Sequence, residues 1–384
     1  MLPIPSNIGL STRRTYSVNG LQPMSTLRCT LKILSAVALI AAAGCEEKFD
    51  LSTLPQQQDT VLDTAYVQIF PPFSGFSGPE DVLIGNDQLL YVADTKANRV
   101  VMLNRAGQQL SARTVLHPFS LAQDSRLDLL VGGEIVVANG DTAGAIFRIH
   151  LVSTSADSAH RLELARVDTM WRELANPRRR FPGITVFGDN FYLAVRTGPD
   201  NSSFIDPDAR VLLFNNHDVF ITPVPALTTR SGSGITDINK PTAIASFPGA
   251  RDFVLVQSSE GVAYGAVWMR YQATADFEGW LPQFDPARPE DRSSDFIRPN
   301  RYLLPDAVTI DRVRRDVFIA DARLDSVFKF NSRGRLKSES FGFTRSSGTM
   351  KRPTGLAFFE KVLYVLDGQQ GQLLRFRLTT DVPR

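Results

Sequence analysis

Five ionisable side chains stand directly beside prolines that recur along the chain. They are Glu80, His117, Lys240, Asp306 and Arg352, next to Pro79, Pro118, Pro241, Pro305 and Pro353. If the fold gathers them at one place, carboxylates and basic groups together would bind an anionic or zwitterionic ligand. If they only border water, they form a solvated polar surface. The sequence leaves both interpretations open.

Short catalytic motifs are missing from the chain. Neither HExxH nor GxSxG occurs, and "SGSG" at 231–234 lacks the lysine of a phosphate-binding loop. Of the four histidines, only His117 stands beside one of these prolines, and one histidine rarely makes a metal site. Asp206 and Asp208 are too few carboxylates for a calcium site. We therefore predict no catalytic residues, no metal and no cofactor, and we favour a protein that is not an enzyme.

The elements that position these residues form six similar units. Each begins at one of the five prolines or at Pro182, where a short run of alternating apolar residues starts. A second apolar run follows at 91–94, 136–139, 192–195, 254–257, 318–321 and 364–367. A third follows at 100–103, 146–149, 211–214, 267–269, 327–330 and 373–376. Such β-branched and aromatic runs between turn residues predict strands, and proline suits the first residue of a strand.

An aspartate ends the second run in three units. Asp94, Asp321 and Asp367 occupy this position. An aspartate side chain readily accepts hydrogen bonds from the backbone of the turn that follows it. We therefore predict that these carboxylates belong to the scaffold.

The unit resembles the NHL repeat, which reads P-x-G-[IV]-A-V, then [IL]-Y-V-A-D-x-x-N-x-R-[IV]. The best copy runs from Pro79 to Leu103 and includes Asp94, Asn98 and Arg99. This resemblance implies an all-β fold, a six-bladed β-propeller of the broad NHL or TolB-like kind, over 64–384. The lone apolar run at 64–70 is expected to add a strand to the last blade and close the ring.

Some propellers of this broad kind are enzymes. Lactonase-like members hold a divalent metal with a glutamate, an asparagine and an aspartate, and the glutamate comes just before a Gly-Pro at a strand start. Ser77 stands at that position here. A metal-dependent hydrolase or lyase with its site at the mouth of the central channel is therefore our alternative function.

Long insertions offer a second candidate surface. Residues 153–180 contain a predicted short helix with Trp171, followed by Arg178–Arg180. Residues 271–304 carry Phe277, Trp280 and Phe284, three aromatic side chains that would either cover a ligand or pack onto their own blade.

The N-terminus predicts an export signal. An apolar run of eleven residues at 33–43 follows basic residues, and Gly44 and Cys45 come directly after it. This arrangement resembles a lipoprotein signal with Cys45 as the lipidated residue. We predict a signal at 1–45, with Met24 as the true start, then a flexible tether at 46–63.

The bulk composition narrows the choice of partners. The 42 basic and 40 acidic residues give a net charge of +2, which argues against nucleic acid. Both cysteines, Cys29 and Cys45, precede the predicted propeller, so no disulfide crosslinks it. We predict a monomeric binding or scaffold lipoprotein of the bacterial cell envelope, on the outer-membrane, periplasmic or surface side. Its partner would be an envelope protein or an extracellular glycan or peptide.

Overall fold

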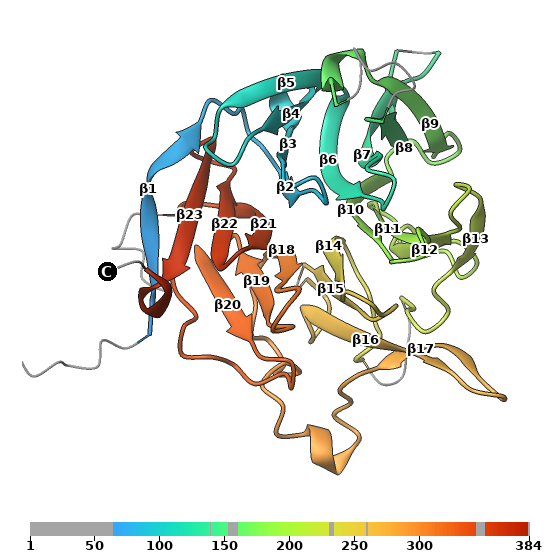
Figure 1. Ribbon diagram of the computed structural model, residues 1–384. Helices are drawn as coiled ribbons and strands as arrows, with labels where there is room; N and C mark the ends of the chain where they lie inside the picture. Colours follow the sequence, from blue (N-terminus) through green and yellow to red (C-terminus); the bar gives the residue numbers. More distant parts are fainter. Residues whose placement is uncertain are drawn as a thin grey trace, which may run out of the picture. The chain divides into compact units, whose positions relative to one another are not determined.

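The computed structural model describes residues 64–138, 140–152, 160–229, 234–258, 260–342 and 350–382. Over these ranges the chain forms six antiparallel sheets arranged in a ring, which confirms the predicted six-bladed β-propeller (Figure 1). The helices described are single 3-10 turns at Thr95–Ala97, Leu162–Leu164, Pro289–Asp291 and Thr379–Asp381. Among these residues, no helix has the length and apolar character needed to span a membrane.

Blades one to three each contain four strands in chain order. Blade one has β2 (Asp81–Ile84), β3 (Leu90–Asp94), β4 (Arg99–Leu103) and β5 (Gln109–Thr114). Blade two has β6 (Leu116–Gln123), β7 (Leu129–Val136), β8 (Thr142–His150) and β9 (Arg166–Arg172). Blade three has β10 (Arg180–Val186), β11 (Tyr192–Thr197), β12 (Arg210–Phe214) and β13 (Phe220–Pro223).

Blade four repeats this pattern, and blades five and six vary it at the outer edge. Blade four has β14 (Pro241–Ser246), β15 (Phe253–Gln257), β16 (Ala266–Ala273) and β17 (Glu278–Pro282). Blade five has β18 (Pro305–Ile310), β19 (Val317–Asp321) and β20 (Ser326–Phe330). Blade six has β21 (Pro353–Phe359), β22 (Val362–Asp367), β23 (Gln372–Leu378) and finally β1 (Tyr66–Ser74). The pairing of β1 with β23 confirms the predicted closure of the ring.

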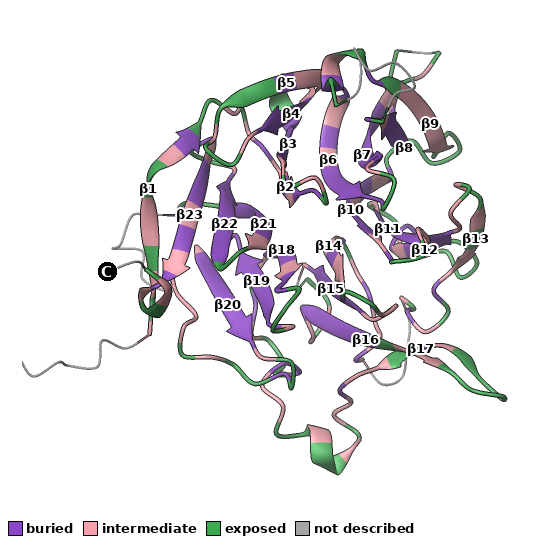
Figure 2. Ribbon diagram, viewed as in Figure 1, coloured by how far each residue is buried: buried purple, intermediate pink, exposed green. Residues whose placement is uncertain are grey.

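The core lies between the blades. Six clusters of buried apolar side chains each join residues of two neighbouring blades. Because each second strand is covered on both faces by adjacent blades, β3, β15, β19 and β22 are buried along their whole length (Figure 2). The innermost strands β2, β6, β10, β14, β18 and β21 contact their neighbours around the ring, and they surround the central channel.

The aspartates at the ends of the second strands are buried scaffold residues. The Asp321 carboxylate accepts backbone N–H bonds from Arg323 and Leu324 in the following turn, at 2.9 and 3.0 Å. Asp367 does the same with Gln369 and Gln370, at 3.0 and 2.9 Å. These bonds confirm the prediction for both residues.

Asp94 uses different partners. Its carboxylate accepts the backbone N–H of Ser77 at 2.5 Å and the Nε–H of Arg99 at 2.8 Å. It therefore joins the segment before the inner strand to the third strand, and the structure gives it no bond to the turn amides that we expected. Asp321 and Asp367 also hold the segment before their inner strands, through the N–H groups of Leu303 and Lys351.

Two local predictions were wrong. The second strand of blade two is β7 at Leu129–Val136, several residues before the predicted run at 136–139. The strand contains Gly132, where a Cβ would lie 2.3 Å from the carbonyl oxygen of Phe181 in blade three, so the close approach of two blades requires glycine there. The predicted helix around Trp171 is the strand β9, in which the indole packs against Phe214 and Phe220.

Candidate functional site

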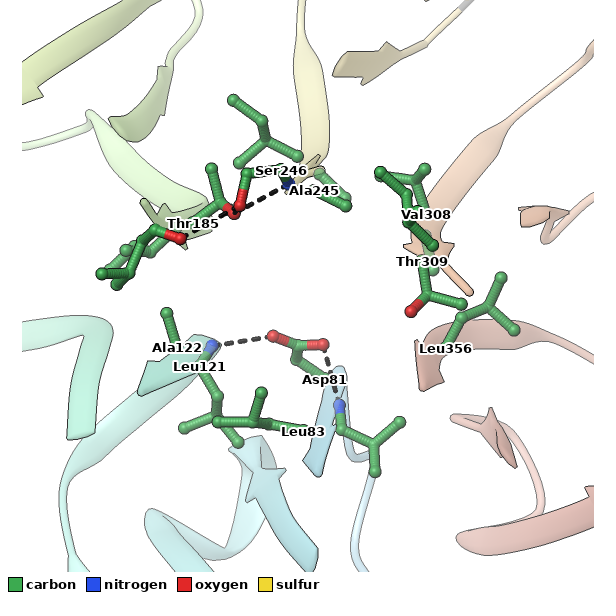
Figure 3. A pocket seen from close by; sticks show the side chains of 18 of the residues that line it. Asp81, Leu83, Leu121, Ala122, Thr185, Ala245, Ser246, Val308, Thr309 and Leu356 are labelled. Carbon is green, nitrogen blue, oxygen red and sulfur yellow. Dashed lines mark hydrogen bonds between the residues drawn. The ribbon is translucent and has the colours of Figure 1, made fainter. Parts of the chain in front are cut away.

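A cavity of about 640 Å³ occupies the central channel. Its walls come from the inner strands of all six blades, and Figure 3 shows side chains from several of them around one opening. The lining combines apolar side chains such as Leu83, Val308 and Leu356 with the hydroxyls of Thr185, Ser246 and Thr309. The volume suits a small organic molecule.

The first mouth of the channel, at the starts of the inner strands, carries three of the five predicted residues. Glu80, Asp306 and Arg352 all line the cavity, and Arg352 Nη2 lies 3.8 Å from Asp306 Oδ2. Burial raises the pKa of Glu80 to about 6, and Arg352 opposes this rise. Burial likewise raises the pKa of Asp306 to about 6, again opposed by Arg352. The charge of one guanidinium therefore opposes the rise in pKa of both buried carboxylates, and it lies nearest to Asp306.

The other two predicted residues are engaged with their own blades. His117 Nδ1 lies 2.9 Å from Glu134 Oε2, and its backbone N–H donates to Asn98 Oδ1. Lys240 Nζ pairs with Glu260 Oε2 at 2.5 Å. Neither residue lines the cavity, although His117 is close enough to lower the pKa of Glu80 slightly. Of the five residues, the structure therefore brings Glu80, Asp306 and Arg352 together at the first mouth, and His117 and Lys240 lie apart from the cavity lining.

Asp81 is a cavity residue that sequence reasoning missed. It is the first residue of β2, and Figure 3 shows its carboxylate in the channel wall. Burial raises its pKa to about 7, while backbone N–H bonds from Leu121 and Val82 oppose the rise. The available signal was its position: two consecutive acids follow Pro79 beside the start of an inner strand, and Asp81 is the one that begins β2.

The second mouth lies at the other ends of the inner strands. Arg312 follows β18 and Asn86 follows β2, and Arg312 Nη1 donates to Asn86 Oδ1 at 3.1 Å. Both residues line the cavity. Since β18 and β2 belong to blades separated by blade six, this bond reaches across part of the opening.

Most of the predicted aromatic surface in the 271–304 insertion is buried. Trp280 packs against Phe253 and Tyr271 and donates its Nε1–H to the carbonyl of Arg251 at 2.7 Å. Phe284 packs edge-on against Trp268. These two rings fill the core, so of the two alternatives left open by the sequence they follow the one in which the aromatic side chains pack inside the propeller. Phe277 alone stays exposed, at 40% of its surface.

The Arg178–Arg180 segment contributes a buried cation. Arg179 is 4% exposed, and its guanidinium bonds Asp208 Oδ1 at 2.6 Å and Asp206 Oδ2 at 2.7 Å. Both aspartates are thus held by arginine. Across the described residues, no three His, Cys, Asp or Glu side chains converge as a metal site would require. Cys45 lies outside the described residues.

Comparison with known proteins supports the fold. No protein-family pattern and no curated protein sequence matches the chain. A gluconolactonase from Xanthomonas campestris has a similar structure, with a TM-score of 0.53 and 14% identity over 82% of this chain and 90% of that chain. An auxiliary nutrient binding protein from Bacteroides thetaiotaomicron has a TM-score of 0.53 and 10% identity, over 79% of this chain and 70% of that chain. A PQQ-bound aldose sugar dehydrogenase from Streptomyces coelicolor has a TM-score of 0.53 and 12% identity, over 82% of this chain and 98% of that chain. At these identities the likeness establishes a propeller fold shared by enzymes and a binding protein.

Proposed function

We propose that this protein is a binding protein that holds a small polar molecule in its central channel without transforming it. The observation that carries the proposal is the cavity of about 640 Å³ with a charged first mouth formed by Glu80, Asp306 and Arg352. Residues from blades one, five and six meet there, so the fold itself positions them. A mouth with charges of both signs favours a ligand with both a donor-rich and an acceptor-rich end.

Binding is favoured over catalysis by how the polar groups are engaged. A metal-dependent hydrolase or lyase needs several convergent ligands with a position left open for substrate. Among the described residues no such group is found, and at the first mouth the Asp306 carboxylate lies 3.8 Å from the Arg352 guanidinium. Of the structural neighbours, the auxiliary nutrient binding protein favours a binding role, whereas the gluconolactonase favours the enzyme alternative.

The cellular location of this binding protein is proposed from the sequence. A cysteine after a short apolar segment and basic residues supports lipidation at Cys45 and anchorage in a bacterial envelope membrane. The polar segment 46–63 would then act as a tether. In this setting a channel ligand would be a solute or a fragment of a glycan or peptide outside the cytoplasm.

A thermal-shift screen tests the proposal. Small polar metabolites and the divalent ions Mn²⁺, Zn²⁺ and Ca²⁺ are added to the wild type, to Thr309→Phe and to Val219→Phe. Thr309 lines the cavity, so its phenylalanine variant fills the channel, whereas Val219 is an exposed residue outside it. We expect an organic ligand to raise the Tm of the wild type and of Val219→Phe only. Stabilisation by a metal ion alone would support the enzyme alternative.

A further inference from the structure

Asp81 is held in a fixed orientation in the channel wall. Its Oδ2 accepts the backbone N–H of Leu121 in blade two at 2.7 Å, and its Oδ1 accepts its neighbour Val82 N–H at 2.8 Å (Figure 3). Each carboxylate oxygen has two lone pairs, so each retains acceptor capacity after these bonds. The residue lines the same cavity as the first mouth.

No basic side chain of the described part of the chain forms an ion pair with Asp81. The charge that acts on it is that of Glu80, which has the same sign. The two arginines of the cavity lining are engaged elsewhere, Arg352 with Asp306 and Arg312 with Asn86. A desolvated carboxylate without a cation is costly, because water no longer solvates the charge.

Other side-chain bonds that join neighbouring inner strands are made by neutral groups. Ser120 Oγ donates to the carbonyl of Phe181 at 2.7 Å, Thr242 Oγ1 to Pro305 at 2.6 Å and Thr354 Oγ1 to Pro79 at 2.9 Å. Each of these links between blades uses a neutral hydroxyl. Asp81 makes a comparable link to Leu121 with a carboxylate, although an amide oxygen would accept the same N–H bond.

The surroundings of Asp81 match an alkylammonium group. Leu83, Val308 and Leu356 offer apolar surface for a short carbon chain, and Thr309 offers a hydroxyl acceptor in the same opening (Figure 3). A calcium ion prefers six to eight oxygen ligands, far more than this wall presents. An ammonium group needs only a carboxylate and one or two neutral acceptors.

We propose that Asp81 binds the protonated amino group of a small organic amine that occupies the channel. The inference rests on the proposed binding function and names the chemical class of its ligand. The amine enters at the first mouth, and its ammonium group supplies the cation that the protein does not provide to Asp81.

The test compares n-butylammonium chloride with 1-butanol, which has a similar length and no charge, by ligand-observed NMR titration at pH 8. The wild type should bind the ammonium at least about tenfold more tightly, since a hydrogen bond to a charged group is stronger than a neutral one. Asp81→Asn keeps an oxygen acceptor for Leu121 N–H and should lose this preference. Ser120→Ala removes a different link between blades and should retain it.

Three results would overturn the inference. One is an equal affinity of the wild type for the two probes, which would leave channel binding intact. Another is a preference that persists in Asp81→Asn but vanishes in Glu80→Gln, which would put the ammonium at the first mouth. The third is no binding of either probe by the wild type. The metabolite screen with Thr309→Phe decides the proposed function separately, so the two failures are distinguishable.

Discussion

At the scale of single residues, Asp321 shows how one buried carboxylate holds a blade together. It is fully buried and accepts backbone N–H bonds from Leu303, Leu304, Arg323 and Leu324. Removing the side chain would leave these donors without their acceptor inside the protein, where each unsatisfied group is costly.

We predict that Asp321→Ala lowers the free energy of unfolding by about 3 kcal/mol or more, because several buried donors lose their partner together. Urea unfolding of the variant and the wild type measures the difference. Asp276→Ala, at an exposed loop position, serves as the control and should change stability by less than about 0.5 kcal/mol. Equal effects of the two substitutions would show that Asp321 is not a scaffold residue.

A second residue-scale prediction concerns pH. The pKa of Asp81 is raised to about 7 in the folded protein, so between about pH 4 and 7 the folded state binds more protons than the unfolded state. The free energy of unfolding should therefore fall as pH rises through this window. Glu80 and Asp306, with pKa values raised to about 6, act in the same direction.

Asp81→Asn removes the Asp81 contribution. Its Tm relative to the wild type should increase by a few degrees between pH 5 and pH 8, as measured by calorimetry without added ligand. A difference in Tm that stays constant over this range would mean that Asp81 titrates normally. Ser120→Ala, which carries no ionisable group, provides the baseline.

At the scale of elements, β1 closes the ring. It is the outer strand of blade six and pairs with β23 along most of its length, while Tyr66 packs against Phe341 beside blade five. Without β1, the edge of β23 would present unpaired backbone groups to solvent, and open edges promote association between chains.

A chain that begins at residue 75 should therefore unfold with lower cooperativity and form soluble aggregates. Size-exclusion chromatography with light scattering and urea unfolding would detect both effects. A chain that begins at residue 62 keeps β1 and should behave as a monomer. If the shorter chain were an equally stable monomer, β1 would be dispensable for closure.

The strands that could be predicted are those with the strongest burial pattern. The repeat is clearest from Pro79 to Leu103. There β3 is covered on both faces by neighbouring blades, and a strand covered in this way needs a continuous apolar run. The strand β7 was misplaced because Gly132 and Gly133 interrupt its apolar run: a Cβ at Gly132 would meet Phe181 of blade three, and one at Gly133 would meet the carbonyl oxygen of Leu116. Outer strands such as β9 face solvent on one side and leave a weaker pattern.

The candidate site was partly predictable for a related reason. Positions beside the prolines mark the first mouth, so Glu80, Asp306 and Arg352 could be found from sequence. Whether a side chain at such a position faces the channel depends on partners that are distant in sequence. His117 and Lys240 are bonded instead to Glu134 and Glu260, 17 and 20 residues away.

At the scale of the whole molecule, six weakly similar units arranged in a ring enclose a central cavity. Each blade buries its faces only against its neighbours, and the channel is the space that their inner strands leave. The same fold carries enzymes and a binding protein among its structural neighbours, so the contents of the channel decide the function.

The most direct test of the binding proposal is a native mass spectrum, with elemental analysis, of the protein purified gently from the cells that produce it. We predict an organic adduct of low mass that is present in the wild type and absent from Thr309→Phe, without a stoichiometric divalent metal. A divalent metal ion bound at one per chain, retained through gel filtration and without an organic adduct, would contradict the binding proposal and favour a metal-dependent enzyme.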